Sequence, residues 1–457
     1  MMMTRRPTFW CALSAVLLLA IAGSPAQAQS RQVPAPQQTR PVAIVHATVH
    51  NPPAAVDGSE EVVWEDGYVL FANGRIVDAG SGDPGDLDGY DVLDAAGLHV
   101  YPGLVAGPTQ LGLVETLQVE ATDDRNELNN EHPEIAAWIA INPDSDLIPV
   151  TRSSGILTAL VFPGGGTIGA QPSAIRLDGW TTEDLVIDKS LGVLVNWPLI
   201  HPVSSRWSRR SRGDQSSRSK EQIAAINRFF DDAEAWIAAR AADPTVPFNA
   251  RFAAMEPVLS GEEPVFIDAS RASQIESAVS WARNRDLKVV IVGGTAAGSC
   301  AELLAENRIP VMLRGTHRLP LNRHDPHDAP FNTPKQLRDA GVLFSIGNAD
   351  SEPAHERGLG HHAATAAAYG LPRGAALRSV TLSPAEIVGL EDELGSIETG
   401  KAATLLVTTG DPLEITSEIL VAFIDGRRID LDDRQKMLVR KYREKYRQLG
   451  LYDQVDP

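Results

Sequence analysis

Apolar and polar positions alternate along the first part of the chain in the manner of β-strands. Residues 42–50, 62–72 and 75–79 are rich in β-branched side chains, and Asn73-Gly74 separates the last two runs. Short alternating runs joined by an Asn-Gly pair are typical of antiparallel hairpins. The pattern therefore predicts a small antiparallel sheet near the start of the chain.

A different pattern begins with the segment from Val100 to Gly112, VYPGLVAGPTQLG, in which a Pro-Gly turn leads into a short apolar run. Beyond it, apolar strand-like runs alternate with amphipathic helical stretches. The strand candidates are ILTALVF, AIRLD, GVLVNW, PVFIDA, LKVVIVGG, IPVMLRG and VLFSIGNA, and the helical ones lie at 220–242, 272–285, 298–307 and 334–340. This alternation predicts an α/β fold with a parallel sheet, and residues 103–390 suit a TIM-like (β/α)8 barrel.

The strand pattern returns after the predicted barrel. Residues 391–431 contain strand-like runs joined by Thr-Gly and Asp-Gly turns, which we expect to complete the N-terminal sheet. Residues 41–102 and 391–431 would then form a small composite β-sandwich domain into which the barrel, residues 103–390, is inserted. Residues 432–457 read as a charged helix and tail on the outside, with Met437, Leu438, Tyr442 and Tyr446 at helical spacing.

Residues 1–28 have the pattern of a secretory signal. Arg5 and Arg6 precede an apolar run from Trp10 to Ala22, and an Ala-x-Ala cleavage site ends at Ala28. The run is shorter than the ~20 residues that a membrane span needs, which favours cleavage over a retained anchor. We therefore expect a secreted, periplasmic protein whose residues 29–40 form a flexible lead-in.

Composition and charge narrow the choice of partners. The chain carries 41 Lys and Arg against 59 Asp and Glu, so it lacks the basic footprint of a nucleic-acid-binding protein. Cys11 lies in the predicted signal, which leaves Cys300 alone and predicts no intrachain disulfide. We expect a small-molecule substrate or ligand, no membrane span in the mature protein and, as the common default, a homodimer.

Three sequence blocks resemble the amidohydrolase superfamily, in particular its secreted, imidazolonepropionase-like branch of metal-dependent hydrolases. VLDAAGLHVYPGLV is similar to the segment that leads into the family's barrel, and GVLFSIGNADS to its eighth strand with a terminal Asp. LRSVTLSPAEIVGLEDELGSIETGKAATLLV is similar to the segment that follows the barrel. The resemblance implies a divalent metal such as zinc at the C-terminal mouth of the barrel, which activates a water for hydrolysis.

The residues that the resemblance would make metal ligands are mostly of other types. The family's His-x-His on strand 1 falls on Pro108 and Gln110, and its strand 5 and strand 6 histidines fall near Asp268 and Gly293. The strand 4 candidate GVLVNWP ends without a lysine, and no histidine lies between His201 and His317. Asp350 alone is retained, and we expect a degenerate site without the usual metal.

Other residues are candidates for a reduced or relocated site. Asp350 and His362 are candidate catalytic groups, and the candidate ligand-binding residues are Gln110, Asp268, His317 and His361. Asp350, His324 and His327 are the set that would bind a metal in a different arrangement. For His324 and His327, local turn bonding by the neighbouring Asp residues is the competing interpretation. For His361 and His362, it is a solvent-facing helix start.

Three further segments bear on the site. The run at 204–220 is basic and rich in serine, which predicts an exposed loop, with an anionic ligand as the alternative. The turn FPGGGTIGAQPS at 162–173 matches no phosphate-binding signature and is expected to be a tight turn. The acidic segment at 115–130 follows the first barrel strand and would overhang the mouth.

Two functions are consistent with these features. The first is a hydrolase of a C–N bond in a non-peptide or cyclic amide, with its reduced or relocated active site at the barrel mouth. The second is a catalytically inactive superfamily member that serves as a periplasmic ligand-binding or assembly module.

Overall fold

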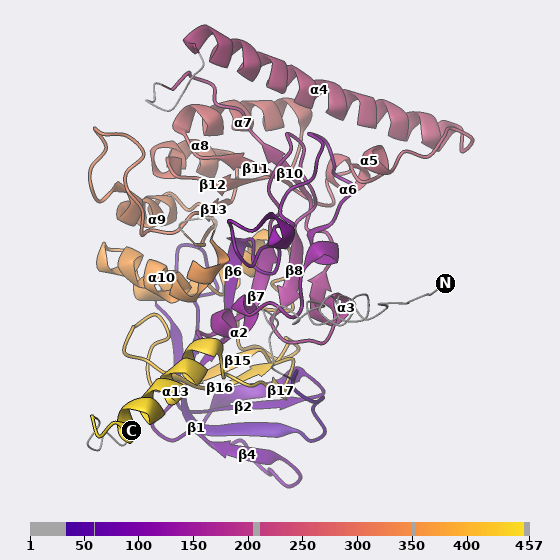
Figure 1. Cartoon of the computed structure of the whole chain (residues 1–457). Coiled ribbons are helices and arrows are strands. Elements are labelled where there is room, and N and C mark those ends of the chain that lie inside the picture. Colours follow the sequence, from indigo (N-terminus) through magenta and orange to yellow (C-terminus); the bar gives the residue numbers. More distant parts are fainter. Residues whose placement is uncertain (1–32, 59, 204–210, 349–351, 452–457) are drawn as a thin grey trace, which may run out of the picture.

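The computed structural model describes residues 33–58, 60–203, 211–348 and 352–451, and the predicted signal lies outside these ranges. An α/β region with the long helix α4 (Arg212–Ala242) along its edge lies above a β-sheet formed by both ends of the chain (Figure 1). Among the described residues, no helix combines the length and the apolar character that a membrane crossing requires.

Both ends of the chain contribute to one eight-stranded sheet. Its strands are β1 (Val42–Asn51), β2 (Val62–Ala72), β3 (Arg75–Ser81), β4 (Asp91–Asp94), β5 (His99–Pro102), β15 (Leu405–Thr408), β16 (Ile419–Ile424) and β17 (Arg427–Arg428). The predicted hairpins β1–β2 and β2–β3 are confirmed, and β5 pairs antiparallel with β15. The described strands of this region lie in a single sheet, and the second sheet of the expected sandwich is not seen among them.

The α/β region contains seven strands of the expected parallel kind. β6 (Leu104–Thr109) pairs with β7 (Ile156–Val161), and a five-stranded parallel sheet follows the chain order. Its strands are β10 (Val193–Asn196), β11 (Val265–Ala269), β12 (Val289–Gly293), β13 (Val311–Leu313) and β14 (Phe344–Ile346). The amphipathic helices between them are α7 (Ala272–Arg285), α8 (Ala301–Glu306) and α9 (Ala329–Asp339).

The third predicted barrel strand, AIRLD, differs from the expectation. Its residues form β8 (Ser173–Arg176), which runs antiparallel to β7 and pairs with β9 (Val186–Asp188). A parallel connection needs a crossover of a dozen or more residues, usually a helix. Only a glycine-rich turn separates β7 from β8, so the two strands form a hairpin and the regular eight-strand pattern is interrupted there.

The basic segment at 204–220 is partly helical, contrary to the predicted loop. Residues 204–210 lie outside the described ranges, but α4 begins at Arg212. Ser211 caps its N-terminus, because the Ser211 hydroxyl accepts a hydrogen bond from the Asp214 amide at 3.1 Å. Arg, Lys and Gln are good helix formers, so this exposed first part of α4 needs no apolar periodicity. Only the later part of the helix buries apolar side chains, among them Phe229 and Phe230.

The remaining elements are short or lie at the periphery. They are η1 (Glu120–Thr122), η2 (Ala137–Ala140), α2 (Leu147–Arg152), α3 (Thr182–Leu185), α5 (Ala250–Ala253), α6 (Glu256–Leu259), η3 (Ala297–Cys300), η4 (Pro353–Gly358), α10 (Leu359–Ala368), α11 (Arg373–Arg378), α12 (Leu382–Ile387) and α13 (Arg434–Gln448). The predicted C-terminal helix is thus confirmed as α13, and Cys300 is a buried free thiol.

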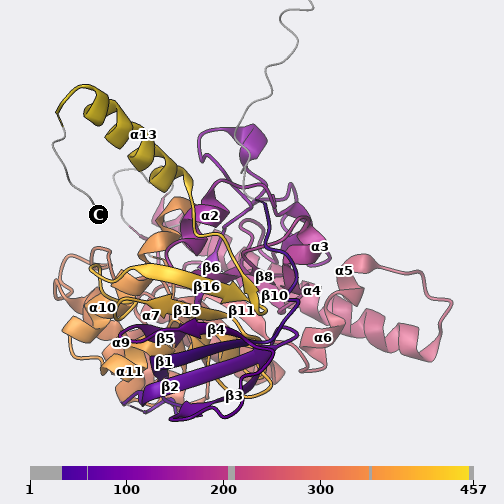
Figure 2. The same cartoon turned by 90° about the horizontal axis from the view of Figure 1, so that it is seen from below.

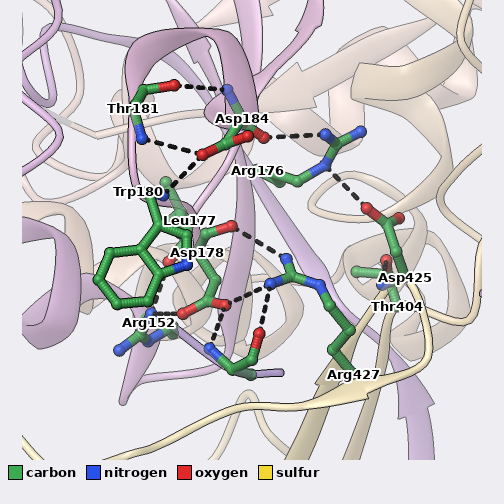
Figure 3. A network of polar contacts seen from close by, with 11 residues as sticks. Arg152, Arg176, Leu177, Asp178, Trp180, Thr181, Asp184, Thr404, Asp425 and Arg427 are labelled. Carbon is green, nitrogen blue, oxygen red and sulfur yellow. Dashed lines mark hydrogen bonds and ion pairs between the residues drawn. The ribbon is translucent and has the colours of Figure 1, made fainter. Parts of the chain in front are cut away.

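A buried carboxylate joins distant parts of the chain. Asp178, which follows β8, accepts hydrogen bonds from Arg152 of α2 at 2.6 Å and from Arg427 of β17 at 2.8 Å (Figure 3). Its second oxygen also accepts the backbone amide of Ala35 at 3.0 Å. Residues 33–40 have no regular secondary structure, and this contact joins the described part of the expected lead-in to the body of the protein.

Candidate functional site

The C-terminal ends of strands from both α/β sheets surround one small cavity, which we call the mouth. Its volume is 110 Å³. The residues that line it are Pro108, Thr109, Gln110, Phe162, Pro163, Gly164, Leu194, Asn196, Asp268, Val292, Arg314 and Asn348. The C-terminal ends of parallel strands are where barrel enzymes place their active sites.

An ion pair between Asp268 and Arg314 is the main charged feature of the mouth. Asp268 stands near the end of β11, in register with Asn196 of β10, and Arg314 directly follows β13. Arg314 Nη2 donates to Asp268 Oδ2 at 3.1 Å. Burial raises the pKa of Asp268, and the charge and hydrogen bond of Arg314 oppose part of that rise. The pair thus places a fixed cation and a carboxylate with a perturbed pKa together in the cavity.

The amide side chains of the mouth are held by the loops that cover it. Arg125 Nη1 donates to Gln110 Oε1 at 3.1 Å, and Arg125 is itself paired with Asp123. Asn196 Nδ2 donates at 2.8 Å to the carbonyl oxygens of both Gly165 and Gly166. The acidic segment at 115–130 and the glycine-rich turn therefore both contribute contacts at the rim, as the position of the acidic segment in the sequence suggested.

The end of β12 is a glycine at which a side chain would be strained and tightly packed. Gly293 has a φ of +92°, and a Cβ on it would lie 3.0 Å from Ser270 Oγ and 3.2 Å from Asp268 Oδ1. A left-handed backbone of this kind is costly for residues other than glycine. The strand that would carry a histidine in the family thus ends in Gly293, which has no side chain and whose backbone lies close to Asp268.

The residues of the mouth do not fit the metal that the family resemblance implies. The described positions equivalent to its ligands hold Pro108, Gln110, Asp268 and Gly293, with Asn196 at the end of β10. Asn196 uses its amide hydrogens on the glycine turn, and Asp268 is engaged by Arg314. Within the described ranges, no group of three His, Cys, Asp or Glu side chains is placed to hold a metal ion. Catalytic metal sites need three or more converging protein ligands.

The candidate histidines lie in two groups. His317 and His362 pack together, with ring centroids 4.2 Å apart, and His317 donates its backbone N–H to His362 Nδ1 at 3.2 Å. His362 is buried, and this bond leaves the proton of its neutral form on Nε2. Burial, together with the charge of His361, lowers the pKa of His317, whose Nε2 lies 2.7 Å from Thr365 Oγ1. None of the three lines the mouth.

The other metal candidates are not gathered at the mouth. The side chain of His324 is 86% exposed, and its Nε2 lies 3.7 Å from Asp325 Oδ1. His327 is also exposed. The local turn bonding that competed with a metal role is present, since Asp325 accepts the Asn322 amide at 2.8 Å. Asp350 lies outside the described residues. Gln110 and Asp268 are thus the two predicted site residues that the structure brings to the mouth.

A larger cavity of 660 Å³ lies on the same side of the α/β region, between the segments that follow β11, β12 and β13. Arg271 and Arg318 line it. Arg318 Nη2 donates to the Thr295 carbonyl at 3.2 Å, and its buried Nε has no hydrogen-bond partner among the described residues. Burial, together with the nearby charge of Arg314, lowers the pKa of Arg318 to about 10. This arginine is held by a backbone carbonyl rather than by a carboxylate, although Asp325, Asp328 and Glu276 also border the cavity.

Sequence reasoning missed Arg314 and Arg125. Arg314 stands in the run IPVMLRG, directly after a predicted barrel strand, where functional residues are expected. That position was a sufficient signal for Arg314. Arg125 lies in an irregular segment, and nothing local in the sequence places it beside Gln110.

Comparisons with known proteins relate this architecture to one group of enzymes. Residues 331–429 match the model of the Amidohydrolase family. An amidohydrolase from Thermotoga maritima aligns with a TM-score of 0.71 at 24% identity, over 85% of this chain and 99% of that chain. A prolidase complexed with N-methylphosphonate-L-proline aligns with a TM-score of 0.52 at 17% identity, over 85% and 99%.

One curated relative extends the likeness in sequence. The amidohydrolase tasK of Hapsidospora irregularis is 24% identical over 401 residues, which cover 79% of this chain. The match takes up only 40% of that protein's length. At these identities the structural likenesses establish a shared fold.

Proposed function

We propose that this chain, which has the amidohydrolase fold and matches that family over residues 331–429, binds a small carboxylate-bearing amide at its mouth without a metal ion. The observation that carries the proposal is the Asp268–Arg314 pair. A guanidinium is always charged and offers several donors in a fixed plane, which suits carbonyl and carboxylate oxygens. Arg314 would thus supply the positive charge that a metal supplies in the metal-dependent hydrolases.

The sizes of the two cavities suggest which part of such a ligand each cavity would hold. Ligand pockets are commonly about 300–1,000 Å³, so the mouth, at 110 Å³, accommodates only a small group. We place the amide there, against Arg314 and the amide side chain of Gln110. The ligand's carboxylate would reach the cavity of 660 Å³, in which Arg318 lacks a carboxylate partner within the described residues.

Hydrolysis of the C–N bond of this ligand is the second candidate function, and the raised pKa of Asp268 favours it. A carboxylate with a raised pKa is a better general base at neutral pH. Asp268 would take a proton from water as the water oxygen adds to the amide carbon, and Arg314 would stabilise the resulting oxyanion. The C–N bond would then break as the amine leaves with the proton held by Asp268.

Binding can be tested with chelator-treated protein by calorimetry. The probes are a panel of N-acyl amino acids and the corresponding amides that lack the carboxylate. We expect the carboxylate-bearing members to bind, and Arg314→Gln to weaken binding more than about tenfold, since a hydrogen bond to a charged group contributes about 1.5–3 kcal/mol. Arg283→Gln, an exposed change on α7, is the control and should bind like the unaltered protein.

The same samples separate binding from hydrolysis. Product analysis by mass spectrometry would detect the free amine, and Asp268→Asn should abolish its release. Binding without product in the unaltered protein supports the ligand-binding function alone. Turnover that appears only after zinc is added would contradict metal-free hydrolysis, and absence of binding until zinc is added would contradict metal-free binding.

A further inference from the structure

The C-terminal helix α13 combines a strong positive charge with an exposed apolar stripe. Between Arg434 and Gln448 it carries seven Lys or Arg and one Glu, a net charge of +6 in a chain of net charge −18. The rest of the chain therefore carries −24. With Asp453 and Asp456 included, residues 434–457 still carry +4.

Most of the apolar side chains of α13, and that of Leu449, which follows it, fall on one face, whereas Met437 points away from that face. Leu438, Tyr442, Tyr446 and Leu449 follow one another at spacings of four and three residues, which on a helix of about 100° per residue gives a continuous stripe. Tyr442 is 47% exposed and Leu449 is 58% exposed. α13 has no buried residue. The stripe thus has no buried member, although its spacing is that of a packed helix face.

Basic residues border this stripe on both sides. Lys441 and Lys445 flank one edge, and Lys436 and Arg443 flank the other, as the helical positions of these residues require. Of these four, none forms an ion pair within the described residues, whereas Arg434, Arg440 and Arg447 are paired with Asp146, Asp432 and Glu444. An apolar stripe between two basic edges is typical of helices that lie in a membrane interface.

The helix also projects from the body of the protein (Figure 2). Its attachment is at the N-terminal end, where Asp433 accepts a hydrogen bond from Ser153 at 2.6 Å and Arg434 pairs with Asp146 at 3.2 Å. At 1.5 Å per residue, Arg447 stands about 20 Å from Arg434 along the axis. That distance is about 2.5 times the Debye length at physiological salt, so salt largely screens the negative charge of the body at the far end of the helix.

We propose that α13 docks the protein on an anionic phospholipid surface, with the Tyr442–Leu449 stripe inserted at the headgroup boundary and the bordering Lys and Arg on lipid phosphates. The opposite charges of helix and lipid favour this occupant. A straight helix with its circumference exposed suits a flat surface, whereas a protein partner needs a shaped groove. This mode of association needs no membrane-spanning helix.

Vesicle co-sedimentation with the full chain tests the proposal. We expect binding to vesicles of phosphatidylglycerol and phosphatidylcholine, no binding to phosphatidylcholine alone, and loss of binding at about 0.5 M salt, where screening is strong. Replacing Lys441, Arg443 and Lys445 by Glu should lower the partition coefficient more than about tenfold, since each basic residue near the surface contributes about a factor of five. Tyr442→Asp with Leu449→Asp should have a similar effect.

The matched control reverses three exposed basic residues of α4, by Arg218→Glu, Lys220→Glu and Arg228→Glu, and should bind the anionic vesicles as the unaltered chain does. Unchanged circular dichroism would show that the variants are folded. Equal binding of all variants, or no binding to anionic vesicles, would overturn the proposal. So would a concentration-dependent dimer in sedimentation velocity that the α13 variants lose, because the stripe would then be occupied by a second copy.

Discussion

Asp268 is the residue of the mouth that combines a raised pKa with an ion pair. It is held on one side by Arg314, and on the other it faces the bare backbone of Gly293, where a Cβ would come within 3.2 Å of its Oδ1. In a metal-dependent hydrolase, the metal ion would compensate the charge of such a half-buried carboxylate. Here a guanidinium that is itself partly exposed has that role, and the compensation is incomplete, because burial still raises the pKa of Asp268.

The pH dependence of the free energy of unfolding should show that Arg314 offsets only part of the effect of burial on Asp268. A carboxyl whose folded pKa lies above its unfolded value stabilises the fold at low pH, and this contribution is lost as the pH rises through the folded pKa. Burial raises the pKa of Asp268 above 3.8, whereas the side-chain amide introduced by Asp268→Asn does not titrate. The free energy of unfolding of Asp268→Asn, relative to the unaltered protein, should therefore rise between about pH 3 and pH 7.

Urea denaturation at a series of pH values measures this difference. Asp57→Asn changes an exposed carboxylate and is the control, with no change of the relative stability expected over the same range. A relative stability of Asp268→Asn that falls with rising pH would mean that the ion pair with Arg314 outweighs burial.

Two residues of the mouth, Gln110 and Asp268, could be identified from the sequence because each lies at the C-terminal end of a recognisable strand. The position of Arg314 directly after a strand could be identified in the same way, but its pairing with Asp268 could not. Which long side chain reaches a carboxylate depends on the relative twist and spacing of β11 and β13, which no local pattern specifies. The contact between the exposed His317 and the buried His362 likewise depends on how α10 packs against the segment after β13.

At the scale of elements, all seven apolar runs that were expected to be strands of the α/β region are strands. Six of them are parallel strands, which are buried on both faces and therefore consist of continuous apolar runs. The direction of β8 was not predictable from its own residues, since it follows from the short turn before it. The start of α4 was missed because helix propensity and the Ser211 cap, rather than apolar periodicity, determine it.

The end of β12 offers a test of how closely the backbone approaches the site. Gly293→Ala should cost the left-handed penalty of about 1 kcal/mol and, in addition, a contact penalty against Ser270 and Asp268. Gly341→Ala is the matched control, because Gly341 also has a positive φ, +75°, but a Cβ there would meet nothing within 4 Å. The difference in unfolding free energy between the two variants gives the cost of the contact between the added Cβ and the side chains of Ser270 and Asp268. Equal losses would show that the space around Gly293 relaxes freely.

At the scale of the whole molecule, the two ends of the chain form one sheet, and the α/β region connects to it through a buried polar cluster. The sheet itself could be predicted from the sequence, because the strand pattern of the N-terminal segment returns after the α/β region. The cluster did not, since Asp178, Arg152 and Arg427 are far apart in the sequence and their meeting depends on how the sheet and the α/β region pack. Asp178, with its side chain 1% exposed, contacts both regions and the lead-in segment.

This arrangement predicts that Asp178 stabilises the molecule as a unit. Asp178→Asn leaves two buried guanidinium groups without their shared counter-charge, and breaking a buried pair in this way typically costs about 3–5 kcal/mol. Asp432→Asn breaks the exposed pair with Arg440 and should cost less than about 1 kcal/mol. Urea denaturation gives both values, and hydrogen exchange should show faster exchange at Ala35, whose amide loses its acceptor. A loss for Asp178→Asn no larger than for Asp432→Asn would mean that packing between the sheet and the α/β region holds them together without the cluster.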